Sequence, residues 1–128
     1  MKQMITALLL LAALSGQAQT KISEVASFKT ETVTMGQLPQ SVPATATFIV
    51  TNTGKQPLVI ERASPSCGCT VADFTKTPIA PGKTGTIKAT YNALNAGNFN
   101  KTITVKFGGI DEVKELHITG EVLVAAKS

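Results

Sequence analysis

Two cysteines separated by one glycine are the residues of this chain whose types and spacing point to chemistry. They lie in the run Ser66-Cys67-Gly68-Cys69-Thr70, and the chain contains no other cysteine. Such a pair can cycle between dithiol and disulfide, or bind a soft ion such as Cu(I). In a straight strand the two Cα atoms lie about 6.5–7 Å apart, at the long end of disulfide geometry. Gly68 permits a tighter bend, and a bridge that closes so small a ring is strained and easily reduced.

The same cysteines also fit a structural role, which is the interpretation that the sequence favours. Two small thiols beside a glycine can fill the core at a bend where the chain changes sheets. Ser64-Pro65-Ser66 supports a kinked connection, because proline fixes φ and serine bonds to the nearby backbone. A catalytic thiol needs an activating basic group, and the sequence shows none. We therefore expect no catalytic residue and no enzyme activity, with Cys67 and Cys69 as reduced thiols or a local disulfide.

A metal site is a further interpretation, and the supply of ligands argues against it. A structural zinc site needs four ligands, whereas the chain has a single histidine, His117. His117 alternates with Leu116 and Ile118, so we place it on the solvent-facing side of a strand. We predict no metal ion and no cofactor.

The elements that must position these residues are short strands. Four segments alternate apolar and polar residues with a period of two, as strands with one buried face do: residues 46–51, 86–91, 102–107 and 116–124. The predicted inward sets are Ala46, Phe48 and Val50; Ile87, Ala89 and Tyr91; Ile103, Val105 and Phe107; and Leu116, Ile118, Val122 and Val124. We expect a further, N-terminal strand at residues 28–36. No segment between residues 26 and 124 keeps helical spacing for more than one turn.

Turn residues separate these segments at short intervals. Asn52-Thr53-Gly54 suggests a hairpin-like link from the strand around Phe48 to residues 57–60. Pro81-Gly82 precedes one strand and Gly108-Gly109 divides the last two. Short strands at this spacing predict an all-β fold, an immunoglobulin-like antiparallel β-sandwich of about seven strands, with a small open barrel as the runner-up.

Residues 1–18 have the pattern of a secretory signal peptide. Lys2 precedes an apolar stretch that ends at Leu14 and is shorter than the ~20 residues of a membrane span. Gly16 and Ala18 suit the small-residue cleavage site, so we expect cleavage after Ala18, without a lipoprotein cysteine after it. The interpretation is an exported protein, periplasmic or extracellular, soluble, with no transmembrane segment in the mature chain and with residues 19–128 as one domain.

Charge and aromatic content exclude one class of partner. The chain has 12 Lys and Arg against 8 Asp and Glu, a net charge of +4. These charges are scattered, whereas a nucleic-acid site requires a basic stripe. A single tyrosine and no tryptophan provide no stacking platform for bases. We therefore expect no nucleic-acid partner.

The order of the motifs resembles the family called domain of unknown function 1573. The resemblance covers about residues 26–124, from the Phe48 strand through the cysteine motif to the closing strand. The residues that carry it in turns and strands are Asn52, Gly54, Pro57, Ser66, Gly68, Thr70, Pro81, Gly82 and Tyr91, together with Cys67 and Cys69. The first strand departs from the family pattern, since Phe28 to Gly36 lacks the usual Asp-Phe-Gly.

The resemblance implies an exported bacterial immunoglobulin-like domain, similar to Hydin-type and major-sperm-protein-like domains, which serve as protein-interaction modules. The leading hypothesis is accordingly a non-enzymatic module that binds an unknown protein of the bacterial cell envelope through sheet edges or loops. The alternative is a thiol–disulfide redox protein or a Cu(I)-binding protein that uses Cys67-Gly68-Cys69.

Overall fold

A computed structural model describes residues 20–124 of the chain. The predicted signal peptide, residues 1–18, lies outside the described residues. No helix within residues 20–124 is both long and apolar enough to cross a bilayer. The described chain forms one helical turn and eight strands: α1 (Ile22–Val25), β1 (Ala26–Phe28), β2 (Thr32–Pro39), β3 (Ala44–Asn52), β4 (Ile60–Pro65), β5 (Thr70–Phe74), β6 (Thr84–Tyr91), β7 (Gly97–Phe107) and β8 (Val113–Leu123).

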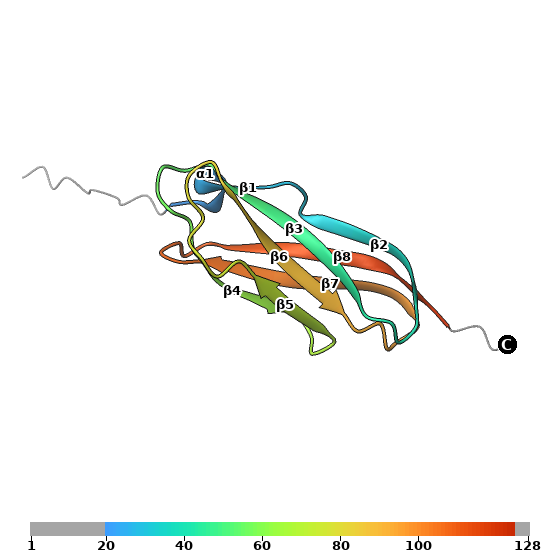
Figure 1. The fold of residues 1–128 in the computed structure, drawn as a ribbon. Coiled ribbons are helices and arrows are strands. Elements are labelled where there is room, and N and C mark those ends of the chain that lie inside the picture. Colours follow the sequence, from blue (N-terminus) through green and yellow to red (C-terminus); the bar gives the residue numbers. More distant parts are fainter. Residues whose placement is uncertain (1–19, 125–128) are drawn as a thin grey trace, which may run out of the picture.

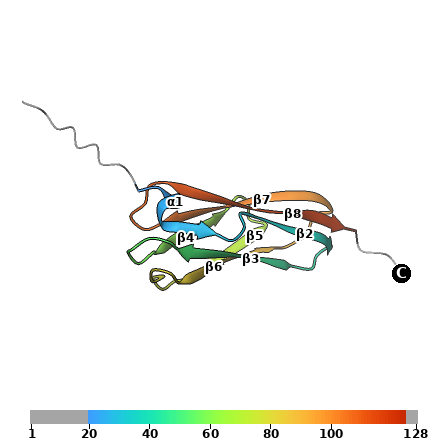
Figure 2. The ribbon, with the colours of Figure 1, turned by 90° about the horizontal axis from the view of Figure 1, so that it is seen from above.

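The strands form two facing sheets, as Figures 1 and 2 show from two sides. One sheet has the order β1-β3-β6-β5 and the other the order β2-β8-β7-β4. All neighbours are antiparallel except β2, which runs parallel to β8. This arrangement confirms the predicted all-β, immunoglobulin-like sandwich, with eight strands where about seven were expected.

The predicted alternation places most of the core correctly. Of the four inward sets, the residues from β3, β6 and β7 are all buried, as are Leu116, Ile118 and Val122 of β8. Val124 is the exception, because β8 ends at Leu123 and the Val124 side chain is 70% exposed. An apolar residue beyond the last ladder bond no longer follows the alternation of the strand.

Two predicted elements are wrong. The expected strand at 28–36 is two strands, since β1 pairs with β3 in one sheet and β2 pairs with β8 in the other. The expected hairpin link after Asn52 is a crossover, because β3 and β4 belong to different sheets. Of the predicted segment 57–60, residues 57–59 contribute only an isolated bridge, between Leu58 and Ile79, and Ile60 is the first residue of β4.

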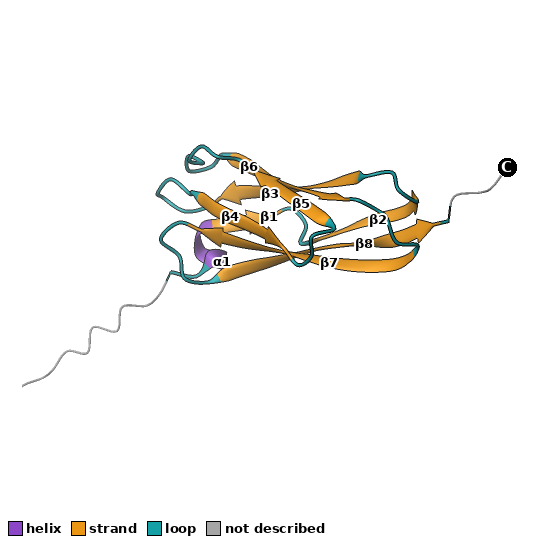
Figure 3. Cartoon of the chain, turned by 90° about the horizontal axis from the view of Figure 1, so that it is seen from below, coloured by secondary structure: helices purple, strands orange, loops and turns teal. Residues whose placement is uncertain are grey.

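The loops gather at the two ends of the sandwich (Figure 3). One end holds α1 with the β3–β4, β5–β6 and β7–β8 connections, and the other holds the β2–β3 and β6–β7 connections. The β4–β5 connection, which carries both cysteines, lies toward this second end. Thr70, the residue after it, pairs with Tyr91, and Tyr91 also pairs with Ala44, the first residue of β3.

Candidate functional site

The cysteine turn connects the edge strand of one sheet to the edge strand of the other. β4 and β5 are those edge strands, and Cys67 and Cys69 lie in the turn between them. The two cysteines are joined by a disulfide, with their Cα atoms 5.2 Å apart. The turn thus brings the Cα atoms closer than a straight strand would, and the chain changes sheets here as the sequence suggested.

Both sulfurs lie in a half-buried position beside one hydroxyl group. The Thr70 side chain is 3% exposed, and its Oγ1 lies 3.8 Å from the sulfur of Cys67 and 3.8 Å from that of Cys69. Both cysteines are half-buried. Cys69 is also one of the residues that pack against the hydrophobic core. The two cysteines are therefore not fully buried core residues.

Ser66 anchors the turn to β7. Its backbone N–H donates to the carbonyl oxygen of Thr102 at 2.8 Å, and its Oγ accepts from the Thr102 N–H at 3.1 Å. A side chain thus replaces one backbone partner where β4 leaves the sheet. Gly68 has no such function: a Cβ there would meet nothing within 4 Å, and its φ is outside the left-handed region. The backbone of the turn does not require glycine at this position.

His117 lies on the outer face of its sheet, as predicted, but it is half-buried rather than fully exposed. Its Nδ1 is 3.2 Å from Thr102 Oγ1, the same threonine that Ser66 contacts through the backbone. His117 therefore lies two strands from Ser66, about 10 Å across the sheet. Among residues 20–124 no group of three or more His, Cys, Asp or Glu side chains is placed to hold a metal ion.

Lys101 is a residue near the cysteines that the sequence did not reveal. It precedes Thr102 on β7 and occupies an inward position between Phe99 and Ile103, where it is half-buried. The β4–β7 register ends with Pro65 opposite Ile103, and Ser66 bonds to Thr102, so Lys101 follows where the chain bends into the cysteine turn. The alternating pattern of β7 contained this signal, since a lysine occupies an inward position, but the register was needed to relate it to Cys67.

The other predicted motif residues cluster at the α1 end, around Asn52. The Asn52 side chain is 1% exposed; its Nδ2 donates to the carbonyl oxygens of Gln56 at 2.7 Å and Ile79 at 2.8 Å. Its Oδ1 accepts from the N–H of Gly54 at 2.9 Å. A Cβ on Gly54 would lie 3.2 Å from Val25 Cγ1, so this position favours glycine. One buried amide therefore holds two loops and the end of β3.

Pro81 and Gly82 belong to the same cluster. Gly82 has φ +79°, a conformation that favours glycine, and its N–H donates to the backbone carbonyl of Asn52 at 2.8 Å. Pro57 is exposed at the start of the segment that bridges to Ile79. These residues shape the turns of the scaffold and bring no reactive group together.

Tyr91 joins the two sheets near the cysteine turn. It pairs with Thr70 in one sheet, and its ring stacks on Phe99 of the other sheet, with centroids 4.2 Å apart and an interplanar angle of 24°. Both rings are buried, at 3% and 8% exposure. Tyr91 is thus a core residue, and its ring is not a binding platform.

A hollow of about 560 Å³ lies at the α1 end. Phe28 and Ile22 form part of its wall, and Glu31 and Lys114, which form an ion pair, line its rim. Glu112 also lines this hollow, and none of the predicted site residues does.

Solved structures resemble this sandwich at low sequence identity. A protein of unknown function from Porphyromonas gingivalis W83 matches with a TM-score of 0.64 and 17% identity, over 76% of this chain and 46% of that one. The chain thus spans less than half of that protein. PapD-like domain 7 of human CEP192 also matches with a TM-score of 0.64, at 10% identity, over 91% of this chain and 97% of that one. At these identities the likeness establishes the fold.

The VesB protease of Vibrio cholerae matches with a TM-score of 0.60 and 14% identity, over 77% of this chain but only 32% of the protease. No curated protein matches the chain. The family model described as "Protein of unknown function (DUF1573)" matches residues 26–122, which cover both sheets, the Asn52 cluster and the cysteine turn. The chain therefore belongs to the DUF1573 family of proteins of unknown function.

Proposed function

We propose that this chain is an exported, non-enzymatic immunoglobulin-like module that binds a protein partner in the bacterial cell envelope. One observation carries the proposal: the motif residues form two clusters at opposite ends of β3, and each cluster supports loops. Asn52 ends β3, whereas the cysteine turn is level with Ala44, about 26 Å away. Catalytic groups must converge within about 3 Å of one reacting atom, whereas a binding scaffold holds separate loops on rigid strands.

Export and binding are tested separately. The mature protein should begin at Gln19 when its N-terminus is sequenced from the envelope fraction, because Ala18 suits signal peptidase. The folded chain, immobilised as bait, should enrich the same envelope protein in repeated pull-downs, and that protein should bind again after purification. A heat-unfolded bait is the control. Failure to enrich any protein above that control would contradict the proposal.

The disulfide supports a second candidate, thiol–disulfide exchange. A dithiol protein would reduce Cys67–Cys69: its two thiols give up two electrons and two protons, its own disulfide forms, and the Cys67–Cys69 bond breaks. The Thr70 hydroxyl, 3.8 Å from each sulfur, can donate to a thiolate. In this candidate the ammonium group of Lys101, one residue before the Thr102 that Ser66 contacts, would stabilise the thiolate electrostatically. In this candidate the reduced pair would also be the Cu(I) ligand.

Alkylation distinguishes this candidate from a purely structural turn. After mild reduction, the thiols of the folded protein should react with iodoacetamide, and Lys101→Gln should slow the reaction by about threefold or more. Lys88→Gln, which removes an exposed lysine from the outer face of β6, is the matched control. Thiols that resist alkylation until the protein is unfolded, with no Cu(I) bound in an anaerobic titration, would exclude the redox and copper roles together.

A further inference from the structure

The sheet edges are poorly suited to binding a partner by strand addition. β1 has three residues, and β4 has a bulge between Ile60 and Arg62 and ends at Pro65, which has no N–H. β2 has a bulge between Thr34 and Gln37 and ends in a proline. Short, bulged and proline-ended edges oppose the addition of another strand.

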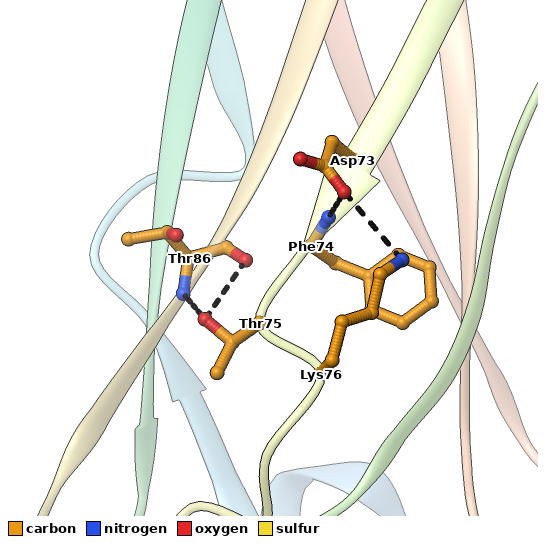
Figure 4. A network of polar contacts seen from close by, with 5 residues as sticks. All are labelled: Asp73, Phe74, Thr75, Lys76 and Thr86. Carbon is orange, nitrogen blue, oxygen red and sulfur yellow. Dashed lines mark hydrogen bonds and ion pairs between the residues drawn. The ribbon is translucent and has the colours of Figure 1, made fainter.

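The β5 edge is blocked by its own side chains, as Figure 4 shows. Thr75 donates its N–H to β6, so the Phe74 N–H points to the free edge. There it donates to Asp73 Oδ1 at 2.9 Å. Lys76 Nζ lies 3.5 Å from the same carboxylate and 3.3 Å from the centroid of the Phe74 ring. Strand addition would have to displace this network, so the loops are the better candidate surface.

The loops at the end opposite α1 carry no charge. We call this surface the uncharged end: residues 40–43 of the β2–β3 loop, residues 92–96 of the β6–β7 loop, and the cysteine turn, residues 66–69. No Asp, Glu, Lys or Arg occurs in residues 32–54, 63–72 or 89–100. Val42 and Leu94 protrude from the two loops, at 51% and 57% exposure. Charge depletion together with exposed aliphatic groups is characteristic of the centre of a protein–protein interface.

Hydrogen bonds between these loops fix their positions relative to one another. Gln40 Nε2 donates to the carbonyl oxygen of Leu94 at 3.0 Å, and the Ser41 N–H donates to that of Ala93 at 2.8 Å. The Asn92 N–H donates to the Cys69 carbonyl oxygen at 2.9 Å. Each loop is thereby tied to its neighbour, and a surface held in this way loses little entropy on binding.

The backbone strain of the described chain occurs at the same place. Ser41 and Ala93, at φ 65° and 55°, are the only non-glycine residues of 20–124 in the left-handed region, and they are hydrogen-bonded to each other. Each immediately precedes one of the protruding side chains, Val42 or Leu94. Such conformations are unfavourable for residues that carry a side chain, and they persist where the surrounding structure holds them. The strained backbone thus lies directly beside the two exposed aliphatic side chains.

The chemistry of the surface identifies the kind of partner. The loops themselves hold no cation, and Lys101 near the cysteine turn is half-buried at an inward position of β7, so the surface presents no cluster of cations to phosphate groups or acidic polysaccharides. The aromatic rings nearest to it, Tyr91 and Phe99, are buried against each other and cannot stack on sugars or bases. Aliphatic tips, backbone groups and amide side chains match a protein surface that is itself uncharged and apolar.

Building on the proposed function, we propose that the uncharged end is the partner-binding surface of this module, and that its occupant is a protein with an uncharged, apolar contact surface centred on Val42 and Leu94.

Site-specific photocrosslinking tests this proposal with the full chain in the cells that export it. A photoreactive phenylalanine analogue is placed at position 94, and at two matched controls: Val113, 44% exposed at the α1 end, and Val71, 69% exposed on β5. We expect one discrete adduct from position 94 and none from the controls. The crosslinked protein, once identified and purified, should bind Leu94→Lys and Val42→Lys at least about tenfold more weakly than wild type.

Two measurements complete the test. Val113→Lys should change the affinity by less than about twofold, and so should raising NaCl from about 50 to about 500 mM, because no charges meet in the interface. Both lysine variants must keep the melting temperature of the wild type, which is expected for side chains that are half exposed.

Each other outcome overturns the inference. An adduct from position 113 or 71 alone means that a partner binds elsewhere. The proposed function then stands, but the uncharged end is not the binding surface. An adduct of twice the mass of the chain identifies a second copy as the occupant, and Leu94-dependent flotation with phosphatidylcholine vesicles identifies a membrane. A strong loss of affinity in high salt contradicts an uncharged contact. No adduct from any position contradicts the proposed function as well.

Discussion

Asn52 links parts of the chain that the strands alone would leave unconnected. Its amide group bonds to Gln56 and Gly54 in the loop after β3, and to Ile79, which lies 27 positions further along the chain. The sequence identified Asn52 and Gly54 as turn residues. It could not identify Asn52 as buried, because the carbonyl oxygen of Ile79, in the β5–β6 connection, reaches it only when β6 pairs with β3.

Replacing this amide tests its role. Asn52→Ala should lower the free energy of unfolding by about 2–4 kcal/mol, because three hydrogen bonds are lost and buried backbone groups lose their partners. Urea denaturation monitored by circular dichroism provides the measurement. Asn98→Ala, at an exposed position, should change it by less than about 0.5 kcal/mol. Equal effects of the two substitutions would show that Asn52 does not clamp these loops.

The disulfide closes a ring of only three residues, so it restricts the unfolded chain little. Replacing both cysteines, Cys67→Ser with Cys69→Ser, should lower the free energy of unfolding by about 1–2 kcal/mol and leave the fold intact. Urea denaturation monitored by circular dichroism measures this change in the free energy of unfolding. A double variant that cannot fold would show that the turn depends on the disulfide, contrary to the anchoring of Ser66 on Thr102.

At the scale of elements, alternation predicted the strands that cross the core. β3, β6, β7 and most of β8 follow the period of two because each has one buried face. The switch between β1 and β2 was not predictable in this way: exposed Lys29, Thr30 and Glu31 separate two strands that belong to different sheets. The bulge between Thr34 and Gln37 also interrupts the alternation of β2. Edge strands contact fewer neighbours, and their pattern is accordingly weaker.

The blocked edge of β5 leads to a prediction about association. Asp73→Ala with Lys76→Ala should leave the Phe74 N–H free and cause concentration-dependent association of the domain. The free energy of unfolding should change by less than about 0.5 kcal/mol, because the ion pair is exposed, with side chains 75% and 66% accessible. Sedimentation velocity provides the readout.

The matched control is Lys83→Ala with Asp111→Ala, which removes the same two charges from exposed loop positions. This control should remain monomeric at every protein concentration at which the wild type is monomeric. If both pairs of substitutions associate equally, or neither does, the network of Asp73, Phe74 and Lys76 does not protect the edge.

At the scale of the whole molecule, the two ends of the sandwich differ in what they hold. The α1 end has the Asn52 clamp and the ion pair of Glu31 and Lys114. The other end has the disulfide, the two strained residues Ser41 and Ala93, and no charge in its loops. The uncharged stretches are visible in the sequence, but they are dozens of residues apart. Only the pairing of β3, β5 and β6 brings them to one surface.

Hydrogen–deuterium exchange of the chain bound to its purified partner is the most direct test of that surface. Binding at the uncharged end should slow exchange of the amides in residues 40–43 and 92–96, since a partner would cover loops whose amides otherwise open to water. Residues 108–112, at the α1 end, should exchange at the same rate in the free and bound chain. Protection confined to residues 108–112 or to β5, with residues 40–43 and 92–96 unchanged, would contradict partner binding at the uncharged end.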